Sequence, residues 1–512
     1  MTELRTSRVG AAVDTAASRR AALEPMIIRR PLARVPVVAA AASLLVVLNL
    51  VGQRYGYHRD ELYFRMLPAA WAYTDQPLLT PFLARATLLL SDEPWALRLP
   101  AAGLAAVSVF LIALLTREVG GGRLAQSLAA WGYAYGTFTL NFGHILMTAS
   151  VDLVVWPLVV LFVVRAVVRQ QERWWWLAGL AVGLSTYNKW LILMLVAAVI
   201  GGLLMAGPRR AMLNQAFVGS AALAIIVAAP NLVWQALHGW PQLAMGGALS
   251  ASNSDEVRLL TAPTLLVMIG PVLFVVCAAG FVGLLRRPEW RPVRWLAPAM
   301  VIMAALTLVA GAQVHYPYGL VSVIFAVGCV PVADFARSTT SRLALVAAAM
   351  VLHLGLNLLI NLPVLPERML AASFVPSLNT GLAEQIGWDN YVRQIDRVTA
   401  AARAEDPGVV VLTSNYGEAG ALDRYTTHRN VPVVSGHNAL GYLDGPPPET
   451  RTVVVVGAQL PRVAEEFTTC TVADRLDSGV AVDNEEEGQP IAVCTGPKQD
   501  WATLWPVLRH LA

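Results

Sequence analysis

The segment VPVVAAAASLLVVLNLV, residues 35–51, decides the fold class, because it is a long apolar run without a charged residue. A helix needs ~20 apolar residues to cross the ~30 Å hydrocarbon core of a bilayer. A strand of a transmembrane barrel would alternate polar and apolar residues instead. Since lipid admits only helices and closed barrels, this run predicts a membrane-spanning helix.

Runs of the same kind recur along the chain. Eleven are predicted to span the membrane: 35–52, 96–116, 123–140, 150–168, 174–188, 190–206, 214–234, 260–285, 295–312, 318–336 and 342–362. The fifth is short, and its merger with the sixth is the main alternative. Of the 512 residues 56% are hydrophobic and 14% charged, whereas a soluble domain carries about 25% charged residues. The chain is therefore predicted to be an α-helical polytopic membrane protein.

The loops between these spans alternate in charge. The compact arginine-rich connections are TREVGGGR (116–123), RQQER (169–173), GPRR (207–210), RRPEWRPVR (286–294) and ARSTTSR (336–342). Positively charged loops stay on the cytoplasmic side of a membrane. The pattern predicts a multi-pass protein of the cytoplasmic membrane, with a disordered cytoplasmic tail at residues 1–34 and an extracytoplasmic C-terminal region.

Two regions are predicted to follow the tail. Residues 35–364 form the transmembrane bundle, whose long first external loop is 53–95. Residues 365–512 form a small α/β domain, since short β-like runs such as VVVLTS and RTVVVVG alternate with turn-rich stretches and an amphipathic segment.

Two smaller features of the external regions are notable. The apolar stretch LLTPFLARATLLL (78–90) is too short to span a membrane and predicts an interfacial helix. Cys470 and Cys494 lie in the external domain, where the compartment permits a disulfide. The sequence leaves open whether they form one.

Ionisable residues inside or beside membrane spans are costly and suggest function. Those predicted at the external end are Asp60, Glu61, Asp75, His144, Asp152, Lys189 and His315, with Tyr316 beside the last. Topology explains the cytoplasmic arginines, but it does not explain this mixture of acids, histidines and one lysine. The sequence therefore predicts one polar site at the outer face of the membrane.

Each of these residues also has a purely structural explanation. The acids of the first loop are typical of solvated loop residues, and Asp152 is typical of a helix cap. Lys189 suits a lysine that snorkels to the interface. His144 suits a hydrogen-bonded loop histidine, and His315 with Tyr316 suits an aromatic belt.

Group transfer from a lipid-phosphate donor suits such a site. A carboxylate acts as general base on an acceptor hydroxyl. Cations hold the phosphate and stabilise its charge as it leaves, while the polyprenyl tail lies in lipid between helices. No cofactor is assigned, although the pair Asp60 and Glu61 suits a divalent cation as an alternative.

Several motifs match a known family. They are YGYHRDELYF (55–64), WAYTDQPLLTP (71–81), LRLPAA (97–102), GHILMTASVDLVVW (143–156), TYNKW (186–190), HYPYGL (315–320) and SNYGEAGALDRY (414–425). Through them the chain resembles bacterial glycosyltransferases of family 39, in the GT-C superfamily, which are related to protein O-mannosyltransferases and lipid A aminoarabinose transferases. The resemblance covers most of residues 45–500. Leu78 stands where the family often has a second proline.

The resemblance implies an inverting transfer of a sugar from a polyprenyl-phosphate donor to an acceptor hydroxyl at the outer face. It implies Asp60 as general base or as the partner that positions the base, with Glu61 beside it, and it places Lys189, His315 and Arg98 at the donor phosphate. The residues implied at the sugar or acceptor are His58, Tyr63, Asp75, His144, Asp152, Tyr316, Tyr416 and Glu418.

Some alternatives stay open. Tyr416 and Glu418 also suit a strand-to-helix turn, because Asn and Gly favour turns. The sugar is open, and so is the acceptor, which can be a glycan, a lipid or a protein. Nucleic acid is not predicted as a partner. A secondary transporter or lipid flippase is the alternative function, and a lipid-binding scaffold without turnover is a third; one-sided clustering and the lack of an internal repeat disfavour transport.

Overall fold

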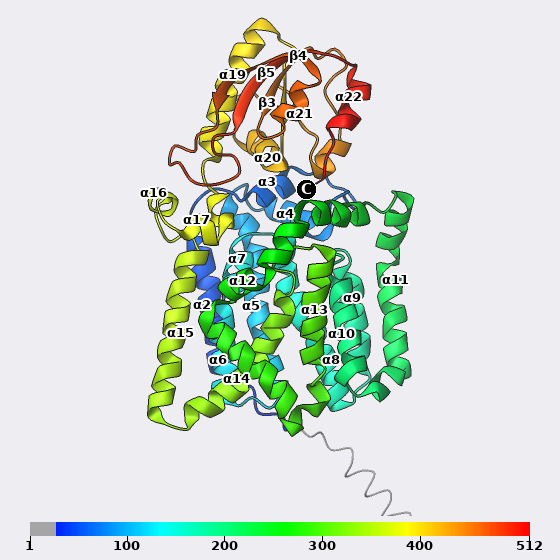
Figure 1. The fold of residues 1–512 in the computed structure, drawn as a ribbon, viewed down its shortest axis with the longest axis vertical. Coiled ribbons are helices and arrows are strands. Elements are labelled where there is room, and N and C mark those ends of the chain that lie inside the picture. The colour runs from blue at the N-terminus through cyan, green and yellow to red at the C-terminus, as the bar shows by residue number, and fades with distance from the viewer. Residues whose placement is uncertain (1–26, 512) are drawn as a thin grey trace, which may run out of the picture.

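The computed structural model describes residues 27–511, apart from the side chains of 252–262, 264, 267 and 268. Most of the predicted tail, residues 1–26, lies outside the described residues. Figure 1 shows a bundle of long helices and, beyond one end of it, a smaller α/β domain.

The bundle consists of long helices joined by short turns. Its helices are α2 (Arg34–Val51), α5 (Pro94–Glu118), α6 (Arg123–Ala134), α7 (Thr137–His144), α8 (Thr148–Arg169), α9 (Arg173–Ser185), α10 (Ile192–Ala206), α11 (Gln215–Leu237), α12 (Pro241–Arg286), α13 (Leu296–Ala310), α14 (Tyr318–Arg337) and α15 (Thr340–Asn361), with 3₁₀ turns η1 (Arg209–Leu213) and η2 (Pro288–Val293). Helix α5 lies in the interior, where it packs against α2, α6, α7, α8 and α14.

The α-helical membrane architecture predicted from the sequence is confirmed. Within the described residues, seven helices are long and apolar enough to cross a membrane, and two shorter ones, α10 and α13, are also apolar. The predicted span 123–140 is divided between α6 and α7, because Tyr135 leaves the helical region and Gly136 is extended. Helix α12 bends at Gly270, whose φ of 73° favours glycine. The count of eleven spans stays a prediction.

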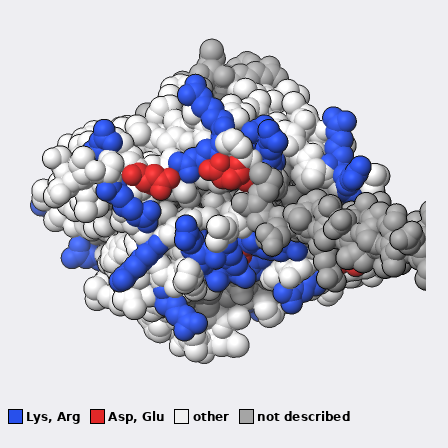
Figure 2. Space-filling model, turned by 90° about the horizontal axis from the view of Figure 1, so that it is seen from below, with Lys and Arg blue, Asp and Glu red and all other residues white. Residues whose placement is uncertain are grey.

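The arginine-rich connections lie together at the end of the bundle opposite the α/β domain. Seen from that end, the surface carries many basic and few acidic side chains (Figure 2). The fully buried Glu118 lies there and forms ion pairs with Arg29, Arg165 and Arg169. The charge alternation along the sequence therefore becomes one basic face in space.

The α/β domain is built on a five-stranded sheet of order β2-β1-β3-β5-β4. Its strands are β1 (Val410–Thr413), β2 (Val433–Ser435), β3 (Thr452–Val456), β4 (Phe467–Arg475) and β5 (Pro490–Pro497). Strand β1 pairs in parallel with β2 and β3, whereas β5 is antiparallel to β3 and β4. Both β1 and β3 are buried along their whole length, as expected of apolar strands covered on two faces.

Helices surround the sheet and connect it to the bundle. They are α16 (Glu367–Ala371), α17 (Val375–Leu378), α18 (Thr380–Ala383), α19 (Trp388–Glu405), α20 (Tyr416–Tyr425), α21 (Leu460–Ala464) and α22 (Trp501–Leu508), with the 3₁₀ turn η3 (Asn438–Tyr442). Cys470 and Cys494 are directly opposed on β4 and β5 and form a disulfide. Such bonds persist in oxidising compartments.

The first loop forms two short helices, α3 (Arg59–Met66) and α4 (Leu79–Leu88), which lie between the bundle and the α/β domain (Figure 1). Helix α4 falls within the stretch predicted as an interfacial helix. Helix α3 begins with a capping box, in which the His58 ring accepts from the Asp60 amide and the Glu61 carboxylate accepts from the His58 amide. The box fixes the start of α3 and the Glu61 side chain.

Candidate active site

A cavity of about 470 Å³ lies at the end of the bundle that faces the α/β domain. Seven of the residues predicted from the sequence line it: Asp60, Tyr63, Asp75, Lys189, His315, Tyr316 and Tyr416. They come from α3, the loop before α4, the turn between α9 and α10, the turn between α13 and α14, and α20. The structure thus joins segments that are more than 350 residues apart in the chain, since Tyr416 contacts Asp60.

Among the residues that the structure describes, the Asp60 carboxylate has one hydrogen-bond partner in the cavity. The Tyr416 hydroxyl donates to its Oδ1 atom over 2.8 Å. The Tyr416 ring packs against the Tyr63 ring, with centroids 4.7 Å apart, and the Arg59 guanidinium lies 5.2 Å from the Tyr416 centroid. The carboxylate is therefore fixed by one of its two oxygens.

Asp75 forms a second acidic position on the cavity wall. The Tyr63 hydroxyl donates to its Oδ2 atom over 3.0 Å, while its buried Oδ1 atom has no partner among the described residues. Burial raises the pKa of Asp75 to about 7, although the Tyr63 hydrogen bond acts in the opposite direction. Asp75 therefore has a buried carboxyl oxygen without a partner, in a residue of the cavity wall.

Lys189 supplies the positive charge of the cavity. Its Nζ atom lies 4.5 Å from the centre of the Tyr316 ring. Burial acts to lower the pKa of Lys189, but Tyr316, Asp152 and the more distant Asp60 together raise it above the ordinary value. The side chain is thus an ammonium at neutral pH, held in a partly enclosed space.

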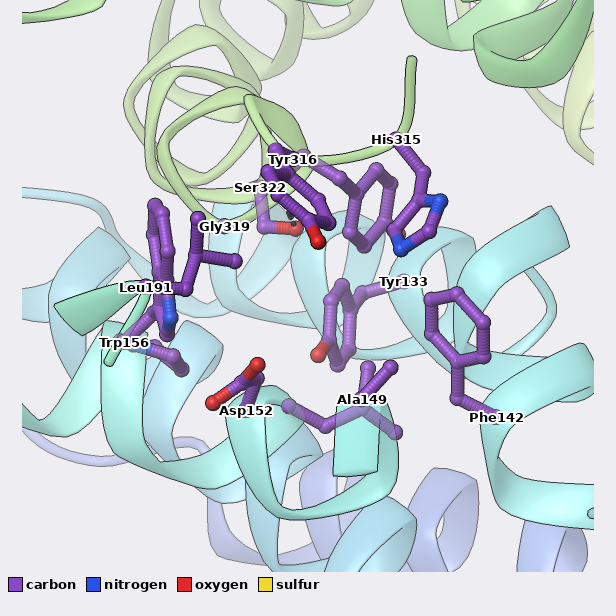
Figure 3. Close-up of a pocket in the computed structure, with 13 residues that line it drawn as sticks. Tyr133, Phe142, Ala149, Asp152, Trp156, Leu191, His315, Tyr316, Gly319 and Ser322 are labelled. Atoms are coloured by element: carbon purple, nitrogen blue, oxygen red, sulfur yellow. Dashed lines mark hydrogen bonds between the residues drawn. The ribbon is translucent and has the colours of Figure 1, made fainter. Parts of the chain in front are cut away.

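Asp152 lies beside this cavity, in a smaller one of about 30 Å³, enough for roughly one water molecule. The two share wall residues, including His315 and Tyr316. Figure 3 shows the Asp152 carboxylate among Trp156, Tyr133 and the other aromatic side chains. The Asn188 amide donates to Asp152 over 3.4 Å.

His315 lies on the cavity wall, and its surroundings determine its charge. Burial lowers the pKa of His315 to about 3, and the nearby Lys189 acts in the same direction. The ring is therefore neutral near pH 7. It can offer a hydrogen bond to a ligand, but it does not supply the positive charge expected of a phosphate-binding cation.

Glu61 and Arg98 lie outside the cavity wall. Glu61 is fully buried, and Arg98 binds both of its carboxylate oxygens, at 3.1 and 2.9 Å. Arg98 also donates to the carbonyl oxygens of Gly52 and Gly56 and to Gln385. Because these groups use the guanidinium donors, the geometry gives Arg98 a structural role instead of the predicted contact with a phosphate.

Three further predicted residues lie outside the cavity wall. The His58 ring is 2.8 Å from the Glu384 carboxylate, and the His144 ring is 3.3 Å from Gln385, so both connect the bundle side to the segment before α19. Glu418 is the N3 residue of α20 and accepts from two backbone amides in a capping box. The strand-to-helix turn left open by the sequence is therefore the structure of this stretch.

Sequence reasoning missed several residues that the structure brings to the site. Asn188 and Asn438 line the cavity, and Arg59 covers the Tyr416 ring. Asn188 lies in the quoted motif TYNKW and Asn438 lies close after the SNYGEAG stretch, so both were within reach of a motif argument. They carry no charge, and the search for ionisable residues therefore passed over them.

Asp60 and Glu61, the adjacent acids of the first loop, have different partners in the structure. Among the described residues, no group of three or more His, Cys, Asp and Glu side chains is placed to hold a metal ion. Arg98 holds the Glu61 carboxylate, whereas Tyr416 contacts Asp60. A divalent cation at these acids stays a prediction.

Comparisons with known proteins bear on this fold and cavity. Residues 75–234 match the model of the family described as dolichyl-phosphate-mannose-protein mannosyltransferase. No curated protein sequence matches the chain significantly.

Solved structures are similar to this chain over about nine-tenths of its length. The apo crystal structure of ArnT from Cupriavidus metallidurans has a TM-score of 0.58 at 13% identity, covering 90% of this chain and 97% of that one. The ArnT structure bound to undecaprenyl phosphate has a TM-score of 0.54 at the same identity and coverage. The arabinofuranosyltransferase AftD from Mycobacteria has a TM-score of 0.53 at 14% identity, covering 91% of this chain but only 40% of AftD.

Fold and cavity together define a polytopic membrane protein with an ArnT-like fold, in which a helical bundle carries an α/β domain over a polar cavity. Within that class, residues 75–234 are similar to the dolichyl-phosphate-mannose-protein mannosyltransferases.

Proposed function

We propose that the chain transfers a sugar from a polyprenyl-phosphate donor to an acceptor hydroxyl, with inversion at the sugar carbon. The observation that carries this proposal is the presence of Asp60 and Lys189 on the wall of one cavity at one end of the bundle. A base and a cation that face the same space suit attack on a carbon whose leaving group is a phosphate. The ArnT structure that holds undecaprenyl phosphate supports this class of donor.

Lys189 is proposed to bind the donor phosphate. An ammonium forms strong charge-assisted hydrogen bonds with phosphate oxygens. It also stabilises the negative charge that develops as the sugar–oxygen bond breaks. His315, which is neutral, and Asn188 are proposed to complete this contact by hydrogen bonding, since both share the wall with Lys189.

Asp60 is proposed to act as the general base. Its Oδ1 atom is held by Tyr416, which leaves Oδ2 for the acceptor. As the acceptor oxygen bonds to the sugar carbon, its proton moves to Asp60 and the bond from that carbon to the phosphate oxygen breaks. The products are the glycosylated acceptor and polyprenyl phosphate, and one displacement from the opposite face inverts the carbon.

The remainder of the cavity wall suits the rest of the donor. Apolar residues of α10, α12 and α13 line it, among them Met194, Leu243 and Ala310, and they suit the start of a polyprenyl tail. Asp75 and Tyr63 are proposed to contact the sugar hydroxyls, because the Oδ1 atom of Asp75 has no partner among the described residues. Asp152 is proposed to support this region through Asn188.

The cavity is proposed to open to the outer face of the cytoplasmic membrane. The basic face at the other end of the bundle supports this orientation by the positive-inside rule. The disulfide between Cys470 and Cys494 supports it independently, because the α/β domain then lies in an oxidising compartment.

Turnover is tested with the purified full chain in lipid nanodiscs. The chain receives a panel of undecaprenyl-phosphate sugars with a cell-envelope extract as acceptor, and the release of free undecaprenyl phosphate is measured. Asp60→Asn should lower release by about 10²- to 10⁴-fold, the usual contribution of a general base, and should bind undecaprenyl phosphate as the unchanged chain does. Asp389→Asn, an exposed acid of the α/β domain, serves as the control.

Two results would contradict the proposal. Release by Asp60→Asn at the rate of the unchanged chain would remove Asp60 from the role of base. Movement of intact lipid-phosphate sugar between leaflets, without release of undecaprenyl phosphate for any sugar of the panel, would favour the flippase alternative.

A further inference from the structure

The wall of the cavity is not made by the bundle alone. Tyr416 and Asn438, both from the α/β domain, line it together with residues of the bundle and the first loop. Tyr416 is the first residue of α20, and its hydroxyl reaches the Oδ1 atom of Asp60 over 2.8 Å. A residue of the α/β domain is therefore the hydrogen-bond partner of the acid proposed as base.

The Tyr416 ring packs against two other aromatic rings. Its centroid lies 4.7 Å from that of Tyr63 and 4.8 Å from that of His437. His437 in turn stacks on His510, with centroids 4.8 Å apart. The row of four rings runs from the first loop to the end of the chain and leaves the Tyr416 hydroxyl little freedom.

The helices that carry the two partners are also fixed against each other. A Cβ atom at Gly420 of α20 would lie 2.8 Å from the backbone of Leu62 in α3, so glycine is required for this approach. Arg59, the neighbour of Asp60, pairs with Glu485 and lies 3.8 Å from Glu486, both in the α/β domain. Docking of the α/β domain and the position of Asp60 are therefore coupled.

The chemistry of the Tyr416 hydroxyl is set by its surroundings. Burial and the nearby Asp60 carboxylate raise the pKa of Tyr416, so the phenol stays protonated and donates. A donor to one carboxylate oxygen stabilises the charged form of the acid and directs the other oxygen toward the cavity.

We infer that Tyr416 is a positioning residue for Asp60, so that the α/β domain completes the active site of the bundle. This inference rests on the proposed role of Asp60 as base. It explains why the first loop, which carries Asp60, packs against the α/β domain as well as the bundle: the two parts must meet before the base is oriented.

Tyr416→Phe tests the inference, because phenylalanine keeps the ring contacts and removes only the hydroxyl. In the release assay, kcat should fall roughly 10- to 100-fold, with KM for the donor within about twofold of the unchanged chain. Tyr442→Phe, a half-exposed tyrosine of the same domain, is the matched control and should change neither quantity.

The outcomes separate the two proposals. If Asp60→Asn is inactive and Tyr416→Phe retains the kcat of the unchanged chain, the positioning role is wrong while the base assignment stands. If Asp60→Asn is active, the base assignment is wrong and the positioning role with it. A raised KM for the donor in Tyr416→Phe, with kcat unchanged, would assign the hydroxyl to donor binding and would also overturn the inference.

Discussion

The Arg98 guanidinium lies 2.9 Å from the Glu61 carboxylate, and neither side chain reaches the cavity that Asp60 lines. Adjacent residues of a helix point about 100° apart, because one turn takes 3.6 residues. Asp60 and Glu61 are therefore neighbours in sequence with different surroundings. The two acids are adjacent in the sequence motif, but they differ in the structure. Asp60 is the candidate base, whereas Glu61 belongs to a structural ion pair with Arg98.

Removal of Arg98 should destabilise the protein. Arg98→Gln leaves the buried Glu61 carboxylate without its cation, which costs on the order of 3–5 kcal/mol in the free energy of unfolding. The loss is measured as a lower midpoint of thermal unfolding in detergent. A variant with the stability of the unchanged chain, but with weaker binding of undecaprenyl phosphate, would return Arg98 to the donor site.

Lys189→Met should weaken donor binding without unfolding the chain. Loss of a charge-assisted contact of about 1.5–3 kcal/mol lowers affinity roughly 10- to 100-fold. Binding of undecaprenyl phosphate to the full chain in nanodiscs measures this directly. The sequence contains two lysines, Lys189 and Lys498, so Lys498→Met, at an exposed site of the α/β domain, is a control. Unchanged affinity in Lys189→Met would support the snorkelling explanation.

Glu418 should make stability depend on pH. Burial and the adjacent Glu486 raise the pKa of Glu418 to about 8, above its ordinary value of 4.5. The folded chain then holds this proton more tightly than the unfolded chain does. Stability from this group is therefore highest below pH 4.5 and falls as the pH rises toward 8.

Glu418→Gln mimics the protonated acid and should remove that part of the decline. Thermal midpoints of the variant and the unchanged chain are compared at pH 5 and pH 8. The difference should favour the variant more at pH 8. A difference that does not vary with pH would mean that Glu418 is already charged in the folded chain at pH 5.

Much of this architecture could be predicted from apolar runs and arginine-rich loops. Separate helices at 173–185 and 192–206 follow from the alternation of loop charge, since a merged span would spoil it. The break at Tyr135 and Gly136 could not be predicted from hydropathy, because residues 123–140 contain no charged residue after Arg123. Hydropathy measures transfer into lipid, whereas such a break depends on contacts with neighbouring helices.

For the candidate site, the sequence predicts which residues gather but not which of them face the cavity. Topology was enough to gather Asp60, Lys189 and His315 at one end of the bundle, because charge in a membrane is restricted to few positions. It could not distinguish a side chain that faces a cavity from one that pairs internally, as Arg98 does with Glu61. Nor could it show that the first loop meets α20, since that contact depends on the docking of the α/β domain.

The orientation of the chain yields the last prediction. Ser377, exposed in the segment beside the α/β domain, and Ser341, exposed at the arginine-rich end, lie at opposite ends of the bundle. Of the described cysteines, Cys470 and Cys494 are bonded to each other, Cys329 is buried and Cys277 is partly buried within α12, so a new surface thiol should react above the background of the unchanged chain. In intact cells, a membrane-impermeant maleimide should label Ser377→Cys and should reach Ser341→Cys only after permeabilisation, with the unchanged chain measured in parallel. The reverse pattern would place Asp60 and Lys189 on the cytoplasmic side, where a donor presented on the outer leaflet could not reach them. It would also contradict the orientation expected from the positive-inside rule and from the disulfide.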